Sequence, residues 1–255
     1  MGNNGRKVAT VILAAGKGTR MKSSIAKVLH PLCGKPMLHY SIALARAIGS
    51  ERIVPVVGHQ AERIQSLFND VDLTFALQKE QLGTAHAVLQ AKQALHDFEG
   101  DVVILCGDVP LLLPSTIEGL IDHHHSHEAS ITVVTTFLAD PGSYGRVIRS
   151  EGDTVMKIVE ARDATDKEKK IKEINTGIYC AERRFLFESL DHIGKENSQG
   201  EYYLTDIFEI GGRQHRKTLP FVLDDSVEAM GINTLSELKR AEEIMKKRTN
   251  GKIWS

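Results

Sequence analysis

Short apolar runs alternate with amphipathic segments along the first half of the sequence. Runs rich in β-branched residues predict four strands, over residues 8–14, 53–57, 73–77 and 102–106. Apolar residues at helical spacing between these runs predict helices over 37–48, 61–68 and 84–95. Strands and helices that alternate in this way are typical of right-handed βαβ units. We therefore expect an α/β fold with a parallel sheet and helices on both of its faces.

The second half of the sequence has a less regular pattern. Further apolar runs predict strands over 131–137, 155–159, 178–180 and 219–223, joined by longer polar loops. We expect these strands to form a mixed sheet or a small β extension. Thr234 and Glu237 form a capping box, which predicts a C-terminal helix from about residue 234. Its apolar stripe is formed by Leu235, Leu238, Ala241 and Met245. Since no linker rich in Pro, Gly or Ser divides the chain, we predict a single domain over residues 1–255.

Composition and charge restrict the class of protein. Of the 255 residues, 42% are hydrophobic and 25% are charged, as in an ordinary soluble globular protein. The 32 Lys and Arg balance 33 Asp and Glu, which argues against a general nucleic-acid binder, because such proteins need excess basic charge. No apolar run reaches the roughly 18–20 residues of a membrane span. The polar start from Met1 to Lys7 does not resemble a signal peptide. We expect neither a nucleic-acid partner nor a membrane partner.

The cysteines and a run of histidines raise the question of a metal site. The cysteines lie far apart, at Cys33, Cys106 and Cys180. Their odd count and wide spacing fit neither a disulfide framework nor a zinc site. Small buried side chains in a reducing, cytoplasmic setting are therefore favoured over a catalytic cysteine. Histidines cluster near the end of a predicted helix, at His123, His124, His125 and His127. Because consecutive positions point in different directions, a solvated helix end is favoured there over a metal site.

The loop after the first predicted strand is rich in glycine and in basic residues. It contains Gly16, Lys17, Gly18, Arg20 and Lys22, and Lys27 follows. Ligands of open α/β sheets bind beyond the carboxyl ends of the strands, and glycines let backbone N–H groups approach phosphate oxygens. A dinucleotide fingerprint would need glycine where Met21 stands, and no Walker A string is present. The loop therefore indicates a phosphate-binding site of another kind.

Asp108 follows the apolar run 102–106 and has two open interpretations. A carboxylate at the end of a buried strand meets the ligand crevice, where it can face a polyphosphate through Mg²⁺. Alternatively, Asp108 satisfies backbone donors in the turn formed by residues 107–110. Position alone favours neither interpretation.

These segments, taken in order, resemble the signature of the sugar-nucleotide pyrophosphorylases. The first is Leu13-Ala14-Ala15-Gly16-Lys17-Gly18-Thr19-Arg20-Met21. The others are residues 27–30, 78–87, 107–111, 144–146, 158–160, 173–177 and 199–206. Over roughly residues 8–235 the series resembles the uridylyltransferase domain of the bacterial bifunctional N-acetylglucosamine-1-phosphate uridyltransferases. The resemblance implies a Rossmann-like nucleotidyltransferase fold, with a mostly parallel central sheet, helices on both faces and a small mixed β extension.

The resemblance also implies an activity and the residues that perform it. The implied enzyme is a UDP-N-acetylglucosamine diphosphorylase, which makes that cell-wall precursor and pyrophosphate from UTP and N-acetylglucosamine 1-phosphate with Mg²⁺. The implied nucleotide-binding residues are Leu13, Ala14, Ala15, Gly16, Gln78, Gly83, Thr84, Cys106 and Gly107. The implied sugar-binding residues are Gly145, Glu160 and Asn175. Arg20, Lys27 and Asp108 are the implied catalytic residues, and Asp108 and Asn233 are the implied Mg²⁺ ligands.

Two departures and two alternatives accompany this hypothesis. Ala26 stands where the family has proline, and Cys106 stands where close members have tyrosine. The first departure bears on the placement of Lys27, and the contacts of the tyrosine cannot be carried over to Cys106. A nucleotidyltransferase for another sugar phosphate or nucleotide, and a non-catalytic nucleotide-sugar binding protein, are the alternatives. No hexapeptide period of a β-helix is visible, so we expect a monomer or a homodimer. The sequence does not distinguish a free-standing protein from part of a longer one.

Overall fold

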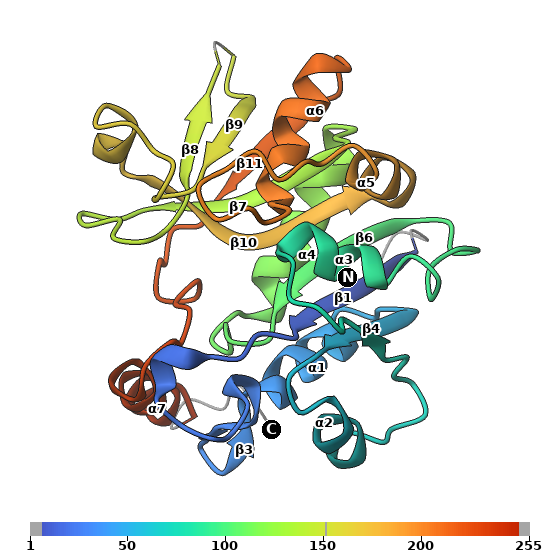
Figure 1. Cartoon of the computed structure of the whole chain (residues 1–255), viewed down its shortest axis with the longest axis vertical. Helices are drawn as coiled ribbons and strands as arrows, with labels where there is room; N and C mark the ends of the chain where they lie inside the picture. Colours follow the sequence, from blue (N-terminus) through green and yellow to red (C-terminus); the bar gives the residue numbers. More distant parts are fainter. Residues whose placement is uncertain (1–6, 151, 250–255) are drawn as a thin grey trace.

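A nine-stranded mixed sheet runs through the centre of the chain (Figure 1). The computed structural model describes residues 7–150 and 152–249. In spatial order, the main path of the sheet consists of β11 (Thr218–Val222), β7 (Ile131–Phe137), β10 (Glu173–Glu182), β6 (Asp101–Cys106), β1 (Val8–Ala14), β4 (Arg52–Val57) and β5 (Ala76–Leu77). The strands β8 (Arg146–Arg149) and β9 (Val155–Val159) branch from β10 as an extension.

The strand directions confirm the expected fold class. β6, β1, β4 and β5 pair in parallel, and β11 pairs in parallel with β7. β10 runs antiparallel to both β6 and β7, and the β8–β9 pair is also antiparallel. The result is a mostly parallel central sheet with a mixed β extension. A separate short hairpin is formed by β2 (Pro31–Leu32) and β3 (Lys35–Pro36).

The apolar character of β1 follows from its position between β4 and β6. Side chains of successive strand residues point to opposite faces of a sheet. Ala9 and Val11 accordingly join the hydrophobic core on one face, whereas Val8 and Ile12 join the core on the other. Both cores are covered by helices, so a strand in this position needs apolar residues in both registers.

Helices cover both faces of the sheet. The face that holds Ala9 packs on α3 (Thr84–Gln90), α5 (Arg183–Leu190) and α6 (Ile207–Arg213). The opposite face packs on α1 (Met37–Ala47), α2 (Ala61–Leu67) and α4 (Pro114–Ser126). Single 3₁₀ turns lie at Thr19–Met21, Lys27–Leu29, Glu168–Lys170 and Leu204–Asp206. No helix of the described residues has the length and apolar character needed to cross a membrane.

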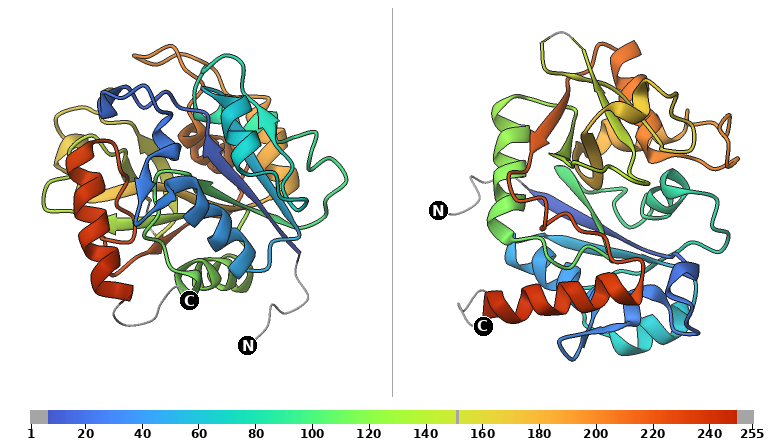
Figure 2. Two further views of the ribbon diagram at one scale, coloured as in Figure 1. Left: turned by 90° about the horizontal axis from the view of Figure 1, so that it is seen from below. Right: turned by 90° about the vertical axis from the view of Figure 1, so that its left-hand side faces the viewer.

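The last helix, α7 (Leu235–Thr249), lies beside the β2–β3 hairpin at the end of the molecule opposite β8 and β9 (Figures 1 and 2). The predicted capping box forms, because Thr234 N donates to Glu237 Oε2 at 2.9 Å and Glu237 N donates to Thr234 Oγ1 at 3.2 Å. Ala241 and Met245 are buried as expected. The prediction for Leu235 was wrong, since this first residue of the helix is 57% exposed.

Other element predictions need correction. The strand predicted over 73–77 pairs continuously only at Ala76–Leu77, with one isolated bridge from Leu73 to Ile53. The helix predicted over 84–95 ends at Gln90 and continues as turns. The strand predicted over 178–180 lies in the second half of the ten-residue β10, whose pairing with β7 is irregular between Asn175 and Tyr179. Polar residues precede this irregularity, so the hydrophobic pattern did not indicate the first part of the strand.

Candidate functional site

A cleft opens where β1 and β6 end, on the side of the sheet that receives their carboxyl ends. It encloses a volume of about 290 Å³. The residues that line it are Leu13, Ala14, Ala15, Gly16, Lys27, Val28, Gln78, Gln81, Gly83, Thr84, Ala87, Cys106, Asp108 and Glu201. Crevices at this edge are the usual ligand sites of open α/β sheets. The structure therefore brings most of the sequence-predicted nucleotide and phosphate residues into one cleft.

The cleft also contains residues to which the sequence analysis assigned no role. These are Val28, Gln81, Ala87 and Glu201. Gly107 was predicted to bind the nucleotide, but it is not among the residues that line the cleft. Its N–H donates to Leu13 O at 2.9 Å, and a Cβ at this position would lie 3.2 Å from the same oxygen. Gly107 therefore fits the close approach of the β6 end to the β1 end.

The side chain of Gln78 is buried and held at one end by the protein. Its Nε2 donates to Gly83 O at 3.1 Å and lies 3.1 Å from Nδ1 of His86. Both hydrogens of the amide are engaged when His86 accepts through Nδ1, so the side-chain oxygen is the part of Gln78 left for a ligand. His86, in the first turn of α3, is a further candidate to which the sequence analysis gave no role, because it contacts Gln78 and does not line the cleft.

The segment around Gly83 is tied to residues far along the chain. Tyr202 N donates to Leu82 O at 2.8 Å, and Ala85 N donates to Tyr202 O at 3.0 Å. Gly83 has φ +117°, and a Cβ here would lie 2.4 Å from Tyr202 O, so only glycine fits. The hydroxyl of Thr84 accepts a hydrogen bond from Leu204 N at 3.0 Å. These contacts fix the wall of the cleft that contains Gln78.

A cluster of charged and polar side chains lies at the mouth of the cleft. The ammonium group of Lys27 forms an ion pair with Asp108, and it donates to Asn233 Oδ1 at 2.5 Å. Arg20 donates to the same oxygen of Asn233 at 2.7 Å. The side chains of Lys27 and Asp108 are only 14% and 24% exposed. The two predicted phosphate-binding cations and the two predicted metal ligands are thus in direct contact.

Local backbone contacts explain how this cluster assembles. Ile232 N donates to Asp108 O at 2.9 Å, which brings Asn233 beside the end of β6. Asn233 N donates to Glu237 Oε2 at 2.7 Å, so the capping box of α7 also holds the predicted ligand. Gly18 has φ +65°, and a Cβ there would meet Lys27 Cβ at 2.4 Å. The glycine-rich loop can therefore pack directly on Lys27.

The donor set of this cluster suits a divalent cation. The carboxylate of Asp108 and the side-chain oxygen of Asn233 both contact one nitrogen, Nζ of Lys27, so the two oxygens converge on a single cationic point. Mg²⁺ takes oxygen ligands and uses one or two protein groups, with water and phosphate oxygens in the other positions. The residues present therefore fit the predicted ion.

The predicted sugar-binding residues lie together, outside the lining of the first cleft. Asn175 N donates to Gly145 O at 2.9 Å, and a Cβ on Gly145 would lie 3.4 Å from Glu160 Oε1. Asn175 Oδ1 accepts hydrogen bonds from Gly177 N at 2.9 Å and from the Tyr179 hydroxyl at 3.0 Å. The amino group of Asn175 therefore remains as the donor that can meet a ligand.

Glu160 and Cys106 complete the surroundings of the predicted sugar residues. Burial raises the pKa of Glu160, which also lines a second cavity with Thr205 and Asp206. Cys106 lines the first cleft and donates to Gly177 O at 3.4 Å. Since Gly177 accepts this bond close to Asn175 on β10, Cys106 lies between the two groups of predicted ligand-binding residues. Burial raises the pKa of the Cys106 thiol, so the side chain is present as a neutral thiol.

Comparison with known proteins gives three findings. Residues 10–171 match the family described as the MobA-like NTP transferase domain. The "Bifunctional protein GlmU" of Geobacter metallireducens is 49% identical over 247 residues, which are 96% of this chain and 52% of that protein. The protein of the same name from Syntrophotalea carbinolica is 50% identical over 244 residues, 96% of this chain and 52% of the relative. The chain thus spans about half the length of these two relatives.

Two further comparisons extend these findings. The "Bifunctional protein GlmU" of Desulfotalea psychrophila is 44% identical over 246 residues, which are 96% of this chain and 73% of the relative. A crystal structure of a UDP-glucose pyrophosphorylase complexed with UDP-glucose superposes with a TM-score of 0.76, at 18% identity, over 95% of this chain and 99% of that chain. At this identity the superposition shows the nucleotidyltransferase fold and nothing more about this chain.

Proposed function

The chain belongs to the family of MobA-like NTP transferase domains, and on this premise we propose that it is a uridylyltransferase. The proposed reaction joins UTP and N-acetylglucosamine 1-phosphate to give UDP-N-acetylglucosamine and pyrophosphate. The observation that carries the proposal is the contact of Arg20, Lys27, Asp108 and Asn233 at the mouth of the cleft beyond β1 and β6. Such a cluster suits the transfer of a nucleotidyl group from one phosphate to another, and an aspartate that only stabilised a turn would not need it.

The proposed chemistry requires alignment and charge neutralisation. A phosphate oxygen of the sugar phosphate forms a bond to the α-phosphorus of UTP, and the bond to pyrophosphate breaks. The attacking oxygen is already an anion, so no general base is required. Arg20 and Lys27 bind phosphate oxygens and stabilise the charge that builds up on them. A Mg²⁺ ion held by Asp108 and Asn233 would neutralise further phosphate charge.

The proposed recognition of the two substrates uses different parts of the site. The backbone of Leu13–Gly16 supports the uracil and ribose, and the side-chain oxygen of Gln78 accepts from the N3–H of uracil. Glu160 and the amino group of Asn175 bind the hydroxyl and acetamido groups of the sugar. In this arrangement Cys106 lies between the nucleotide and the sugar.

The proposed setting is the cytoplasm, with a monomer or a homodimer as the assembly. The three cysteines are free, which suits a reducing compartment. Size-exclusion chromatography with light scattering checks the assembly.

A pyrophosphate-release assay tests the function. Purified protein is given a panel of nucleoside triphosphates and sugar 1-phosphates with Mg²⁺. We expect the highest kcat/KM with UTP and N-acetylglucosamine 1-phosphate. A different preferred pair supports another nucleotidyltransferase of this fold. Binding of UDP-N-acetylglucosamine without pyrophosphate release, from any pair, supports a non-catalytic binding protein and contradicts the proposal.

A further inference from the structure

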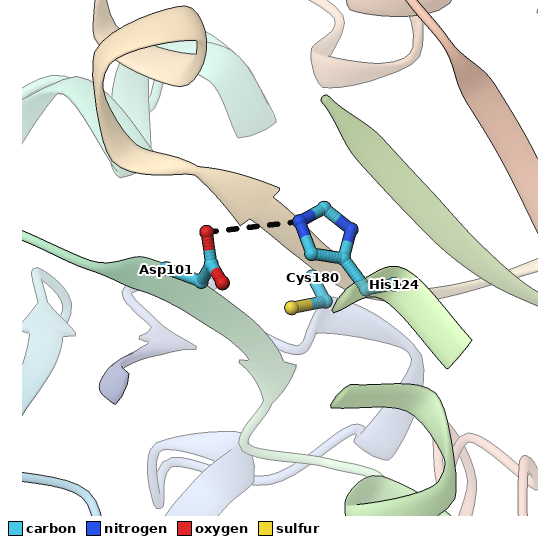
Figure 3. Close-up of side chains that lie close together, drawn as sticks. All are labelled: Asp101, His124 and Cys180. Carbon is cyan, nitrogen blue, oxygen red and sulfur yellow. Dashed lines mark ion pairs between the residues drawn. The ribbon is translucent and has the colours of Figure 1, made fainter. Parts of the chain in front are cut away.

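A second group of metal-ligating side chains lies at the opposite edge of the sheet from the nucleotide cleft (Figure 3). Asp101 begins β6, Cys180 lies in β10, and His124 lies in the last turn of α4. The ligand atoms of these three residues all lie within 4.8 Å of one another. Since β6 runs from Asp101 to Cys106, roughly 16 Å of strand separates this group from the cleft.

The burial of this group differs from the expectation for the histidine run. We expected a solvated helix end, but His124 is 2% exposed and Cys180 is fully buried. The side chain of Asp101 is only 16% exposed. The end of α4 packs on the sheet here, because Ala129 N donates to His124 O and the chain turns directly into β7. Of the predicted solvated histidines, His127 is exposed.

The side chains face one another from three elements, as Figure 3 shows. His124 Nε2 lies 3.7 Å from Asp101 Oδ1. The other ring nitrogen of His124, Nδ1, lies 2.9 Å from Thr132 Oγ1. When Nδ1 carries the proton and donates to this hydroxyl, Nε2 presents its lone pair to the group. The second oxygen of Asp101 contacts Nε2 of His125. Two of the three ligands are therefore oriented by hydrogen bonds from outside, which is typical of metal sites.

Charge balance also favours a divalent cation at this position. Cys180 is a free cysteine whose side chain is fully buried, and a thiolate in that position needs a cation beside it. A bound cation would release the thiol proton. The thiolate, the Asp101 carboxylate and a neutral His124 then carry two negative charges, which a divalent ion neutralises. A neutral assembly of this kind is compatible with a buried position.

We propose that Asp101, His124 and Cys180 form a binding site for a divalent transition metal of the zinc class, with Thr132 and His125 as the residues that orient the ligands. A combination of thiolate, imidazole and carboxylate suits Zn²⁺, whereas Mg²⁺ and Ca²⁺ take oxygen ligands. The metal would join the end of α4 to β6 and β10. This site is separate from the proposed Mg²⁺ position at Asp108 and goes beyond the proposed function.

Cobalt spectroscopy on the wild-type protein provides the first test. Protein stripped of metal by a chelator is titrated with Co²⁺, and then with Zn²⁺ as a competitor. We expect one equivalent of Co²⁺ to give the near-ultraviolet absorption of a thiolate–cobalt bond, and Zn²⁺ to abolish it. Zn²⁺ should also raise the Tm of the folded protein, and Mg²⁺ should leave the thiolate–cobalt absorption unchanged. Folded wild-type protein that shows no thiolate–cobalt absorption contradicts the proposal.

Variants then identify the ligands. Cys180→Ser should remove the absorption, whereas Cys33→Ser should retain it, because Cys33 is exposed and remote in the fold. His125→Gln should weaken binding about 10–100-fold while keeping the absorption, as expected of a positioning residue. If Cys180→Ser does not fold, two other results test the assignment. The thiolate–cobalt absorption should be retained in Cys33→Ser and in Cys106→Ser, and the metal affinity of His125→Gln should be reduced. An absorption that is lost in Cys33→Ser or Cys106→Ser, or unchanged affinity in His125→Gln, overturns the assignment.

Discussion

The guanidinium group of Arg20 donates a 2.7 Å hydrogen bond to the side-chain oxygen of Asn233, across 213 positions of the sequence. The bond joins the glycine-rich loop after β1 to the segment that leads into α7. The predicted phosphate-binding loop and a predicted metal ligand are thereby held together in the protein itself. Donors and acceptors arranged in advance do not need to reorganise during the reaction, which is the basis of electrostatic preorganisation.

Asp108→Asn should lower kcat by roughly two decades or more, because the substitution keeps the size of the side chain and removes the charge that holds the cation. Affinity for uridine nucleotides without metal should change little, since Gln78 and the Leu13–Gly16 backbone are untouched. The measurements are kcat over a range of Mg²⁺ concentrations and calorimetric binding of UDP in the presence of a chelator. Near-normal turnover at ordinary Mg²⁺ would return Asp108 to the role of a turn residue.

Lys27→Asn should impair turnover far more than Lys22→Asn, by about two decades in kcat/KM. Lys27 is 14% exposed and contacts both predicted metal ligands, whereas Lys22 is exposed. Asparagine suits both variants, because Lys22 has φ +49° and asparagine tolerates this left-handed conformation. The two variants are compared in the pyrophosphate-release assay. Equal losses would show that the phosphate contacts are assigned to the wrong lysine.

N-acetylglucosamine 1-phosphate should exceed glucose 1-phosphate in kcat/KM by about tenfold or more, because a site built around hydrogen bonds rejects an analogue that leaves them unmade. Asn175→Asp should reduce this preference. The substitution retains an oxygen that can accept from Gly177 and Tyr179, and it replaces the NH₂ donor with a carboxylate oxygen that can only accept. Asn69→Asp, at an exposed position, is the matched control. Equal efficiencies for both sugars with the wild-type protein would contradict the amino-sugar assignment.

His86→Leu should lower the discrimination between UTP and CTP by about tenfold. In the wild-type protein Gly83 and His86 hold the amino group of Gln78, so its oxygen is presented to the base. Uracil carries a donor at N3 and cytosine carries an acceptor there, so the orientation of this amide separates the two bases. The variant allows the amide to rotate. His96→Leu, at an exposed histidine, is the control. If His86→Leu keeps the wild-type preference for UTP over CTP while Gln78→Ala loses it, His86 does not position the side chain of Gln78.

Gly83→Ala should destabilise the protein by more than about 2 kcal/mol, whereas Gly34→Ala should cost only the strain of a positive φ, about 1 kcal/mol. Gly83 has φ +117° and its added Cβ would meet the Tyr202 backbone at 2.4 Å. Gly34 has φ +83° with nothing within 4 Å of the added atom. Urea denaturation gives both free energies of unfolding. A similar loss in the two variants would mean that the Tyr202 segment moves aside easily.

Local signals in the sequence determined much of the fold. Continuous apolar runs indicated the buried strands β1 and β6, and apolar residues three to four positions apart indicated the helices between them, because these patterns depend only on neighbours along the chain. The capping box at Thr234 and Glu237 formed as predicted for the same reason. The glycine-rich loop also lies at the edge of the sheet where an open α/β fold binds ligands.

Only the tertiary structure decided which distant residues meet. The contact of Asn233 with Lys27 depends on the backbone bond from Ile232 to Asp108, and His86 reaches Gln78 only through the packing of α3. The strand β10 inserts between β6 and β7, which buries Cys180 beside Asp101. The residues next to Cys180 in the sequence do not indicate this contact. Pairing of this kind is stabilised by the burial of whole faces of the sheet, a property that no short stretch of sequence contains.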